Sequence, residues 1–492
     1  MAILIDFDFV SYTASGAINA GGSVAFYDTG TATPKTVYSD AALTTPLSNP
    51  FTLDNAGRFS GPVYAPNGER YAILERTSGA ASIRTRDPVW GTVEDSLDGS
   101  YTSSYSGASA RTLQSRLDEK ISVKDFGAVG DGTTNDAVAI QAAIDAAELI
   151  RGTVYFPATA NQYYCASQLT INAPIALLGD AGLTRIKFAS AMTVGTISTT
   201  GEGCIDVLDV KGFSASGLTF VTMNNVALSL RGCREFDIVD NRFLQSVGET
   251  WTDDSAHCVL VQRSPNVSAI ENFRITDNFF EPGANAILVI GGTTSGTENP
   301  TNFCIANNQV DCGSMTTAGT SSLIKIDRFC TNWVIAANQI WGNGATSASF
   351  KSAIIAEEGS AQGVISNNSI HGYVGRGIEL NTDNAAGADA FHDILIVGNG
   401  IYAAQGSGGG YGIYLETVGA SSTNITVRGN HIVDSEQSIR EETAGIDNLV
   451  VEGNTSVDCT GIGILIKSNN AIVRNNSVLG SQASYSYRDV AG

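Results

Sequence analysis

Charged side chains recur at equivalent positions of a repeated pattern in the C-terminal half of the chain. Each copy contains an aliphatic residue on which the copies can be aligned: Ile324, Ile354, Ile378, Ile413, Ile439 and Ile464. One residue after these anchors stand Lys325, Ile355, Glu379, Tyr414, Arg440 and Leu465. Three residues after them stand Asp327, Glu357, Asn381, Glu416, Glu442 and Lys467. If the copies are neighbouring strands, both columns lie on the outer face of one sheet.

Two carboxyl groups on such a face could hydrolyse a glycosidic bond. With strands about 4.8 Å apart, a diagonal such as Glu357 to Glu379, or Glu379 to Glu416, spans roughly 8 Å between backbone positions. Inverting glycosidases hold their two carboxyl groups about 6.5–9.5 Å apart, which leaves room for a water molecule. Crowded carboxylates also raise the pKa of at least one of them, as a general acid requires. We therefore predict that Glu379 acts with Glu357 or Glu416 as the catalytic pair.

Aromatic and basic residues near these columns are candidates for substrate binding. Tyr414 lies in the first column, Tyr373 and Trp341 lie in preceding loops, and such rings can bind the faces of sugars. Arg440 is a further candidate. A lyase would instead need a base and a group that neutralises a carboxylate, for which Arg376 and Arg440 are the outward candidates. The simplest alternative is an ordinary solvated face, because the chain has 49 acidic residues.

The elements that would position these residues are indicated by a line of asparagines. Three residues before each of them stands an isoleucine or valine, and the spacing is 30 or 31 residues from Asn278 to Asn430, then 24 and 22. A fixed period of this kind indicates a solenoid, and the alternating β-branched residues indicate strands. We predict one coil of a parallel β-helix per repeat, with stacked asparagines at a left-handed corner. The asparagines are Asn241, Asn278, Asn308, Asn338, Asn368, Asn399, Asn430, Asn454 and Asn476.

A glycine-rich segment over residues 122–136 precedes a stretch with helical periodicity over 137–150. Thr133 and Asp136 have the spacing of a capping box, and the helix is predicted to place Val138, Ile140 and Ile144 on one apolar side. The segment closely resembles the opening of the pectate-lyase-like superfamily, found in tailspikes and polygalacturonases. With the asparagine repeats, the resemblance covers residues 113–480. It implies a right-handed, single-stranded parallel β-helix whose open end is sealed by this helix.

A second candidate site is the Asp253-Asp254 pair, which His257 follows. An Asp-Asp pair with a nearby histidine is similar to polygalacturonases, which also carry Asn-Thr-Asp, Gly-His and Arg-Ile-Lys. Asn-Thr-Asp occurs here at 381–383 and Arg-Ile-Lys at 185–187, but in a different chain order, and no Gly-His follows. Asp253 and Asp254 are therefore the fallback. No spacing indicates a metal site, and no cofactor is expected.

The chain before this helix differs in character. Residues 1–95 contain the strand patterns Val24–Tyr27 and Tyr71–Leu74 and resemble the N-terminal adaptor modules of phage tail fibres and tailspikes. We predict a β-rich attachment domain over 1–95, a linker and neck over 96–118 with a short helix at 113–117, the β-helix over 119–480 and a short tail over 481–492. The fold class is thus all-β.

The composition of the chain limits the kinds of partner that it is expected to bind. A net charge of −21 argues against nucleic-acid binding, which requires a basic surface. The eight cysteines show no metal spacing, and buried free thiols from a reducing cytosol are expected. No signal peptide and no apolar run long enough for a membrane span are found.

The resemblance implies a virion protein of the phage tail, synthesised in the host cytoplasm. It would contact tail or baseplate proteins through residues 1–95, form a homotrimer with Trp333 among the candidate contacts, and bind host surface polysaccharide. Three functions stay open: a depolymerase, for which hydrolase chemistry is favoured over lyase chemistry, a non-catalytic glycan-binding fibre, or a free bacterial polysaccharide hydrolase or lyase. The particular polysaccharide and host are not indicated by any residue.

Overall fold

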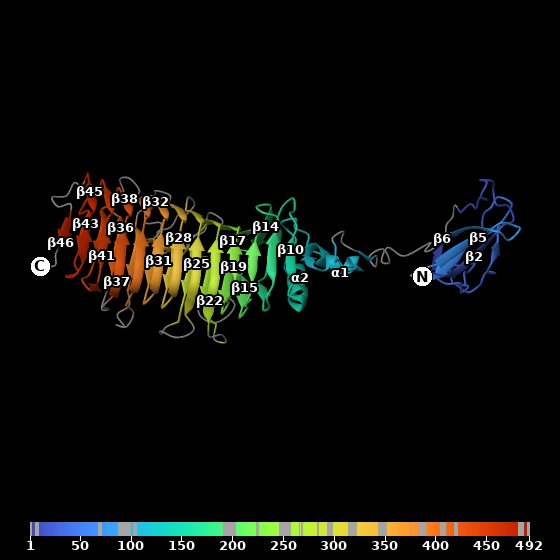
Figure 1. The fold of residues 1–492 in the computed structure, drawn as a ribbon, viewed down its shortest axis with the longest axis horizontal. Helices are drawn as coiled ribbons and strands as arrows, with labels where there is room; N and C mark the ends of the chain where they lie inside the picture. Colours follow the sequence, from blue (N-terminus) through green and yellow to red (C-terminus); the bar gives the residue numbers. More distant parts are fainter. Residues whose placement is uncertain are drawn as a thin grey trace. The chain divides into compact units, whose positions relative to one another are not determined.

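The computed structural model describes residues 2–4, 9–66, 71–86, 100–101, 106–189, 203–222, 226–245, 257–264, 266, 269–282, 285–292, 299–312, 322–342, 352–373, 375–382, 390–403, 410–417, 422–480 and 487–489. The chain divides into two compact units, Met1–Glu119 and Lys120–Gly492 (Figure 1). No helix in the described ranges has the length and apolar character that a membrane span needs.

The first unit is built on a small antiparallel sheet with the strand order β3-β2-β5-β6. Its strands are β3 (Phe51–Thr52), β2 (Ser23–Asp28), β5 (Tyr71–Arg76) and β6 (Ser82–Arg86). The two strands predicted from alternation pair directly, with Phe26 opposite Ile73. Both side chains are buried in the core of this unit. A short helix, α1 (Leu113–Leu117), lies where the neck helix was predicted.

The second unit is a parallel β-helix, as predicted, with three long parallel sheets. The first sheet runs from β9 (Lys120–Ser122) to β44 (Ile472–Arg474), and the second from β11 (Tyr163–Cys165) to β45 (Ser477–Leu479). The third runs from β12 (Leu169–Ile171) to β46 (Tyr487–Asp489). Because each coil adds one strand to each sheet, residues one repeat apart are neighbours; Figure 1 shows the strands stacked in chain order.

The asparagines form a continuous hydrogen-bonded ladder between the first and second sheets. Each side-chain amide nitrogen donates to the Oδ1 atom of the next asparagine, over 2.9–3.2 Å from Asn241 to Asn476. The same oxygen accepts the backbone N–H of the asparagine before it. The ladder is buried from Asn241 to Asn454. The predicted stacking at equivalent corners is therefore confirmed.

The left-handed residue of the corner is not the asparagine itself, which corrects our expectation. It is the preceding residue, which has a positive φ in all nine coils, for example 60° at Asp277 and 55° at Ala337. The asparagine side chain is then free to bond along the stack. The corner residues are Asp240, Asp277, Asn307, Ala337, Asn367, Gly398, Gly429, Gly453 and Asn475.

The interior of the coils is a single apolar cluster. The isoleucines that precede the asparagines are buried in it, and phenylalanines stack in register: the Phe273 ring lies 4.5 Å from that of Phe236 and 4.7 Å from that of Phe303. Trp333 continues this column and is fully buried. Gly363 follows it and leaves space for the indole, since a Cβ atom there would lie 2.1 Å from the ring. Trp333 is thus a core residue and not a subunit contact.

The helix α2 (Ala137–Ile150) packs on the first coil. Its buried side consists of Ala137, Ile140, Ala143, Ile144 and Ala147, whereas Val138 is 77% exposed, contrary to prediction. The predicted capping box is also absent. Asp136 is the N-cap, and its carboxylate accepts the backbone N–H groups of Val129, Gly130 and Tyr164 instead of capping α2. This fixes the glycine-rich segment to the first coil.

All eight cysteines are free, as predicted, and seven of them are buried. Burial raises the pKa of Cys233 to about 12, because a thiolate loses its hydration in the apolar interior. These thiols are therefore packing residues.

We predict that Asn338→Asp destabilises the protein far more than Asn332→Asp. At Asn338 the change removes two donated hydrogen bonds, to Ile305 O and Asn368 Oδ1, both 3.0 Å long, and buries a charge beside those oxygens. We expect a loss of about 3 kcal/mol or more in the free energy of unfolding. Asn332 belongs to an exposed ladder, and its φ of 53° suits aspartate equally well. Urea unfolding of both variants measures the difference, and equal losses would contradict a stabilising role for the buried ladder.

Candidate functional site

The outer face of the third sheet presents the two predicted columns in the expected register. Ile324 of β27 (Ser322–Asp327) pairs with Ile354 of β30 (Ser352–Glu357), which pairs with Ile378 of β33 (Arg376–Asn381). The register continues through β36 (Tyr411–Glu416) and β39 (Gln437–Glu441). Glu379 consequently lies between Ile355 and Tyr414.

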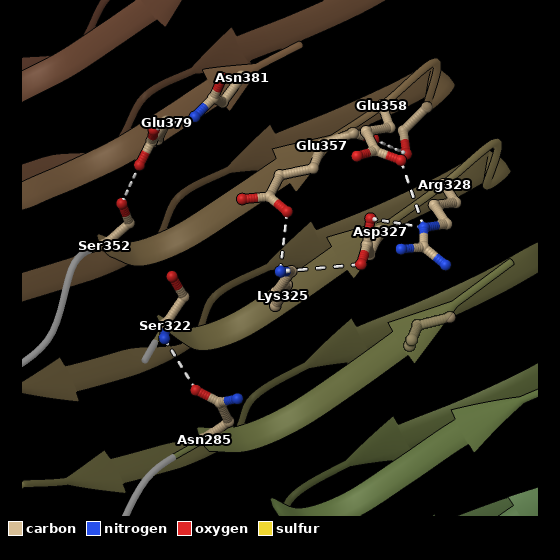
Figure 2. Close-up of polar contacts among 12 residues, drawn as sticks. Asn285, Ser322, Lys325, Asp327, Arg328, Ser352, Glu357, Glu358, Glu379 and Asn381 are labelled. Carbon is tan, nitrogen blue, oxygen red and sulfur yellow. Dashed lines mark hydrogen bonds and ion pairs between the residues drawn. The ribbon is translucent and has the colours of Figure 1, made fainter. Parts of the chain in front are cut away.

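Glu379 is fully buried and its carboxylate is already occupied. Ser352 Oγ donates to one oxygen, while Arg376 Nη1 and Asn381 Nδ2 donate to the other, the latter over 3.0 Å. Figure 2 shows the Glu379 carboxylate turned toward Ser352, on the neighbouring strand. A carboxylate with these partners orients the groups around it, and no part of it is open to a substrate.

A second carboxylate cluster surrounds Lys325 (Figure 2). Lys325 Nζ lies 2.8 Å from Glu357 Oε2 and 3.7 Å from Asp327 Oδ2. These two oxygens are therefore no more than about 6.5 Å apart, a limit that meets the lower end of the range for inverting glycosidases and includes the roughly 5–5.5 Å of retaining ones. Arg328 Nε lies 3.9 Å from Asp327 Oδ1 and 3.3 Å from Glu358 Oε2. The cluster thus alternates acids and bases along two adjacent coils.

Asp327 has the environment that a proton donor needs. It is 6% exposed, and its Oδ1 atom has no hydrogen-bond partner among the described residues. Burial raises the pKa of Asp327 to about 6; the nearby Lys325 opposes this rise, and the neighbouring Glu357 adds to it. A carboxyl group with this pKa exchanges its proton in the range in which most enzymes operate.

Tyr414 lies between two guanidinium groups. Arg376 stacks on its ring at 3.7 Å and Arg440 lies 5.9 Å from the ring centroid. Arg440 also donates to the Tyr411 hydroxyl over 3.1 Å, and the Tyr411 and Tyr414 rings are 5.0 Å apart. Because Tyr414 is only 5% exposed, its ring face is covered by arginine. The guanidinium edges, not the ring, are what this cluster offers to a ligand.

The remaining predicted substrate residues lie elsewhere. Trp341 is on β29 (Gln339–Trp341) of the second sheet, 37% exposed, so it does not share a face with Glu379. It precedes His371 in its column, and His371 stacks on Tyr402 at 4.5 Å. Tyr373 is fully buried in the core of the coil, so no face of its ring is accessible. The aromatic residues therefore do not form one platform.

The other acidic candidates differ in accessibility. Glu416 is partly exposed and lies 3.9 Å from Arg376, beside the Glu379 cluster. Asp253 and Asp254 lie outside the described residues. His257, which follows them, is buried with Nδ1 2.9 Å from Asn285 Nδ2, and burial lowers the pKa of His257 to about 3. The histidine is thus neutral at physiological pH.

Sequence reasoning did not assign a role to Asp327 or Lys325, and it considered Arg376 only as a neutralising group for a lyase. All three stand in the aligned columns or at the start of the same strands. Their proximity to the predicted catalytic residues could therefore be predicted from the repeat. Their burial could not be predicted, because the repeat does not indicate which outward side chains are covered by their neighbours. No group of three or more histidines, cysteines and carboxylates is placed to hold a metal within the described parts of the chain.

Comparison with known proteins identifies the family. The family described as rhamnogalacturonase A/epimerase, pectate lyase-like, matches residues 120–379. The chain belongs to this family. Mannuronan C5-epimerase AlgE3 of Azotobacter vinelandii is 44% identical over 78 residues, or 14% of this chain, and AlgE6 is 69% identical over 36 residues, or 7%. Each match spans only 4% of the length of that relative.

Solved structures of the pectate lyase-like fold include phage tailspikes. The Dettilon tailspike protein aligns with a TM-score of 0.54 and 14% identity, covering 76% of this chain and 70% of that one. A mutant tailspike of E. coli bacteriophage HK620, in complex with a pentasaccharide, aligns with a TM-score of 0.52 and 12% identity. The alignment covers 80% of this chain and 72% of that one. PfbA, a surface adhesin of Streptococcus pneumoniae, aligns with a TM-score of 0.50 and 18% identity, covering 74% of this chain and 93% of that one. At these identities the likeness establishes the fold.

The raised pKa of Asp327 predicts a pH-dependent effect on stability. Because the folded state binds this proton more tightly than the unfolded state, the favourable contribution is fully present below the unfolded pKa of 3.8 and is lost as pH rises through about 6. The stability of Asp327→Asn relative to the parent should therefore rise between about pH 4 and about pH 6 and then stay level, with a total gain on the order of 2–3 kcal/mol. Thermal unfolding across this range measures it. The exposed Asp237→Asn serves as control, and a flat difference for Asp327→Asn would contradict the burial argument.

Proposed function

We propose that the chain is a tailspike-type virion protein that binds bacterial surface polysaccharide and hydrolyses it on the outer face of the third sheet. In this proposal Asp327 is the general acid and Glu357 its carboxylate partner. The observation that carries it is the buried Asp327, with its raised pKa, sharing Lys325 with Glu357. The pentasaccharide in the HK620 tailspike complex and the N-terminal unit support the substrate class and the virion setting.

The proton transfers follow from the charges around each carboxyl group. Asp327, protonated below about pH 6, would donate its proton to the glycosidic oxygen as the bond breaks. The Glu357 carboxylate is paired with the Lys325 ammonium at 2.8 Å, which holds it beside Asp327. As a carboxylate, Glu357 either takes a proton from the attacking water or attacks the sugar carbon itself, and a separation of no more than about 6.5 Å is compatible with both routes.

Glu379 takes a positioning role in this proposal. Its carboxylate holds Arg376, whose guanidinium lies 3.7 Å from the Tyr414 ring. Arg376 and Arg440 would then donate hydrogen bonds to sugar hydroxyl groups along the same face. Glu416, beside Arg376, completes the edge of this cluster.

Lyase chemistry is the second candidate, and the two arginines are the observation that favours it. Guanidinium groups flanking the buried Tyr414 could neutralise the carboxylate of a uronic acid, as β-elimination requires. However, Arg376 is paired with Glu379 and Arg440 with Glu442. Because these charges are compensated, hydrolysis is the function we put first.

We predict that Asp327→Asn and Glu357→Gln each lower kcat by about 10²–10⁴-fold, the range for loss of a general acid or base. The parent rate should fall as pH rises through about 6, because Asp327 loses its proton. Reducing-end release from a panel of bacterial capsular and O-antigen polysaccharides measures turnover, and ultraviolet absorbance detects an unsaturated lyase product.

Two controls make this test decisive. Asp237→Asn removes an exposed carboxylate on the first sheet, paired with Arg274, and should leave the rate unchanged. Glu379→Gln should weaken substrate binding through Arg376 more than it slows the chemical step. Full turnover in both Asp327→Asn and Glu357→Gln would place the active site elsewhere, and an unsaturated product would favour the lyase.

Homotrimer formation is part of the proposal. The described apolar side chains that are exposed near the start of the β-helix are those expected of a buried interface. They include Leu149, which is 87% exposed, and also Phe126, Val129, Val138 and Ile150.

We predict that light scattering gives the mass of a trimer, and that Leu149→Glu lowers the mass of the particle at micromolar concentration because a charge would be buried at the interface. Ile472→Glu, at a 51% exposed position at the opposite end of the β-helix, controls for the added charge. A parent protein that stays monomeric would contradict trimer formation.

A further inference from the structure

A polar surface cavity lies at the corner between the first and second sheets, separate from the third-sheet cluster. It has a volume of about 340 Å³. Three consecutive coils form its floor, through the corners that follow β19 (Asp237–Val239), β22 (Ile270–Thr276) and β25 (Pro300–Ala306). The side chains that line it include Asp240, Arg242, Asp277, Phe279, Asn307 and Gln309.

The corner column explains why the cavity begins and ends where it does. The corner residue one coil before Asp240 is Gly217, where a Cβ atom would lie 2.6 Å from the Gly179 carbonyl oxygen, so the chain around Gly179 closes this side of the cavity. One wall is the turn at Ala181 and Gly182. After Asn307 the corner residue is Ala337, which is too short to extend the lining. The column therefore places polar side chains in the cavity only from Asp240 to Asn307.

The polar side chains of the cavity are uncommitted within the described structure. The side chains of Asp240, Asp277, Asn307 and Gln309 make no hydrogen bond or ion pair with any described residue. Arg242 makes only a stacking contact, with its guanidinium 4.3 Å from the Phe279 ring. By contrast, Asp237, three residues before Asp240, is paired with Arg274. These donors and acceptors are thus available to a ligand.

The mixture of groups fits a carbohydrate. Carboxylates and amide oxygens accept from sugar hydroxyl groups, amide and guanidinium N–H groups donate to them, and the stacked Arg242–Phe279 pair offers a flat edge. The volume is in the range of small-molecule sites, about 300–1,000 Å³. Two carboxylates against one guanidinium disfavour an acidic sugar. A calcium ion would need six to eight oxygen ligands, and the guanidinium would repel it.

We propose that this cavity is a second glycan subsite, which binds a neutral or amino-sugar residue without cleaving it. It lies on other sheets than Asp327 and Glu357, so it would hold one part of a polysaccharide while another part reaches the third sheet. Two linked contacts raise the apparent affinity for a long chain without any new contact at either site. The cavity therefore anchors the polymer.

The test compares a cavity variant with its neighbour in the same column. Gln309→Trp fills the cavity, whereas Gln339→Trp changes the equivalent exposed residue of the next coil, outside it. Asp277→Asn removes one acceptor and keeps a residue that tolerates its φ of 60°. The probes are an array of neutral and amino-sugar oligosaccharides from bacterial O-polysaccharides. Calorimetry on those that bind then counts the sites per chain.

We expect Gln309→Trp and Asp277→Asn to bind at least one probe about tenfold more weakly or more, equivalent to about 1.4 kcal/mol, with one site fewer in Gln309→Trp. Gln339→Trp should bind like the parent. Parent-like binding of every probe by both cavity variants, or no bound probe at all, would overturn the proposal. So would calcium chloride binding that is lost in Asp277→Asn.

Measurements of polysaccharide cleavage test the proposed catalytic residues on the third sheet separately. Loss of turnover in Asp327→Asn with an intact cavity concerns only the catalytic assignment. Unchanged turnover in Asp327→Asn, together with weakened binding in Gln309→Trp, would contradict the catalytic assignment and support the anchoring subsite.

Discussion

The structure depends on one spacing, that between hydrogen-bonded parallel strands. Every coil is stacked on the last at this distance, so each residue has an equivalent residue above and below it. The asparagine ladder satisfies buried amide groups only because the repeat returns the same residue to the same corner. The phenylalanine stacks in the interior follow the same spacing. A shift by one residue in any coil would break the ladder and turn apolar side chains outward together.

On the outer face, this spacing forces charged side chains together. Residues in one column cannot separate, so Asp327 and Glu357 must share the space around Lys325. The state of a carboxylate on this face depends on its hydrogen-bond partners, as two coils separated by one strand show. Glu379 has a serine, an arginine and an asparagine as donors, whereas Asp327 Oδ1 has no hydrogen-bond donor among the described residues. The same geometry therefore yields a carboxylate with all its hydrogen bonds satisfied in one coil and a proton-binding carboxyl group two coils away.

The sequence was sufficient for the repeat, the strand register and the aligned columns, because each depends on period alone. It was not sufficient to predict which outward side chains are buried or which hydrogen-bond partners they have. Glu379 and Asp327 occupy similar outward positions, yet the first is enclosed by donors, and nothing in the period distinguishes them. Tyr373 and Trp341 were grouped as loop aromatics, but one is buried and the other belongs to a different sheet. The left-handed corner residue was misplaced by one position, because aspartate, asparagine and glycine all tolerate that conformation.

Two kinds of polar site can arise on such a scaffold, and they follow from where the chain turns. Within a strand, outward residues of adjacent coils face one another and pair, as Lys325 does with Glu357. At the corner between the first and second sheets, the left-handed residues Asp240, Asp277 and Asn307 line a cavity without pairing with one another. Pairing shifts proton affinity and suits acid–base chemistry, whereas unpaired corner groups keep their full hydrogen-bonding capacity for a ligand. Catalysis is therefore best sought on the sheet faces of this β-helix, and anchoring of a long polymer at its corners.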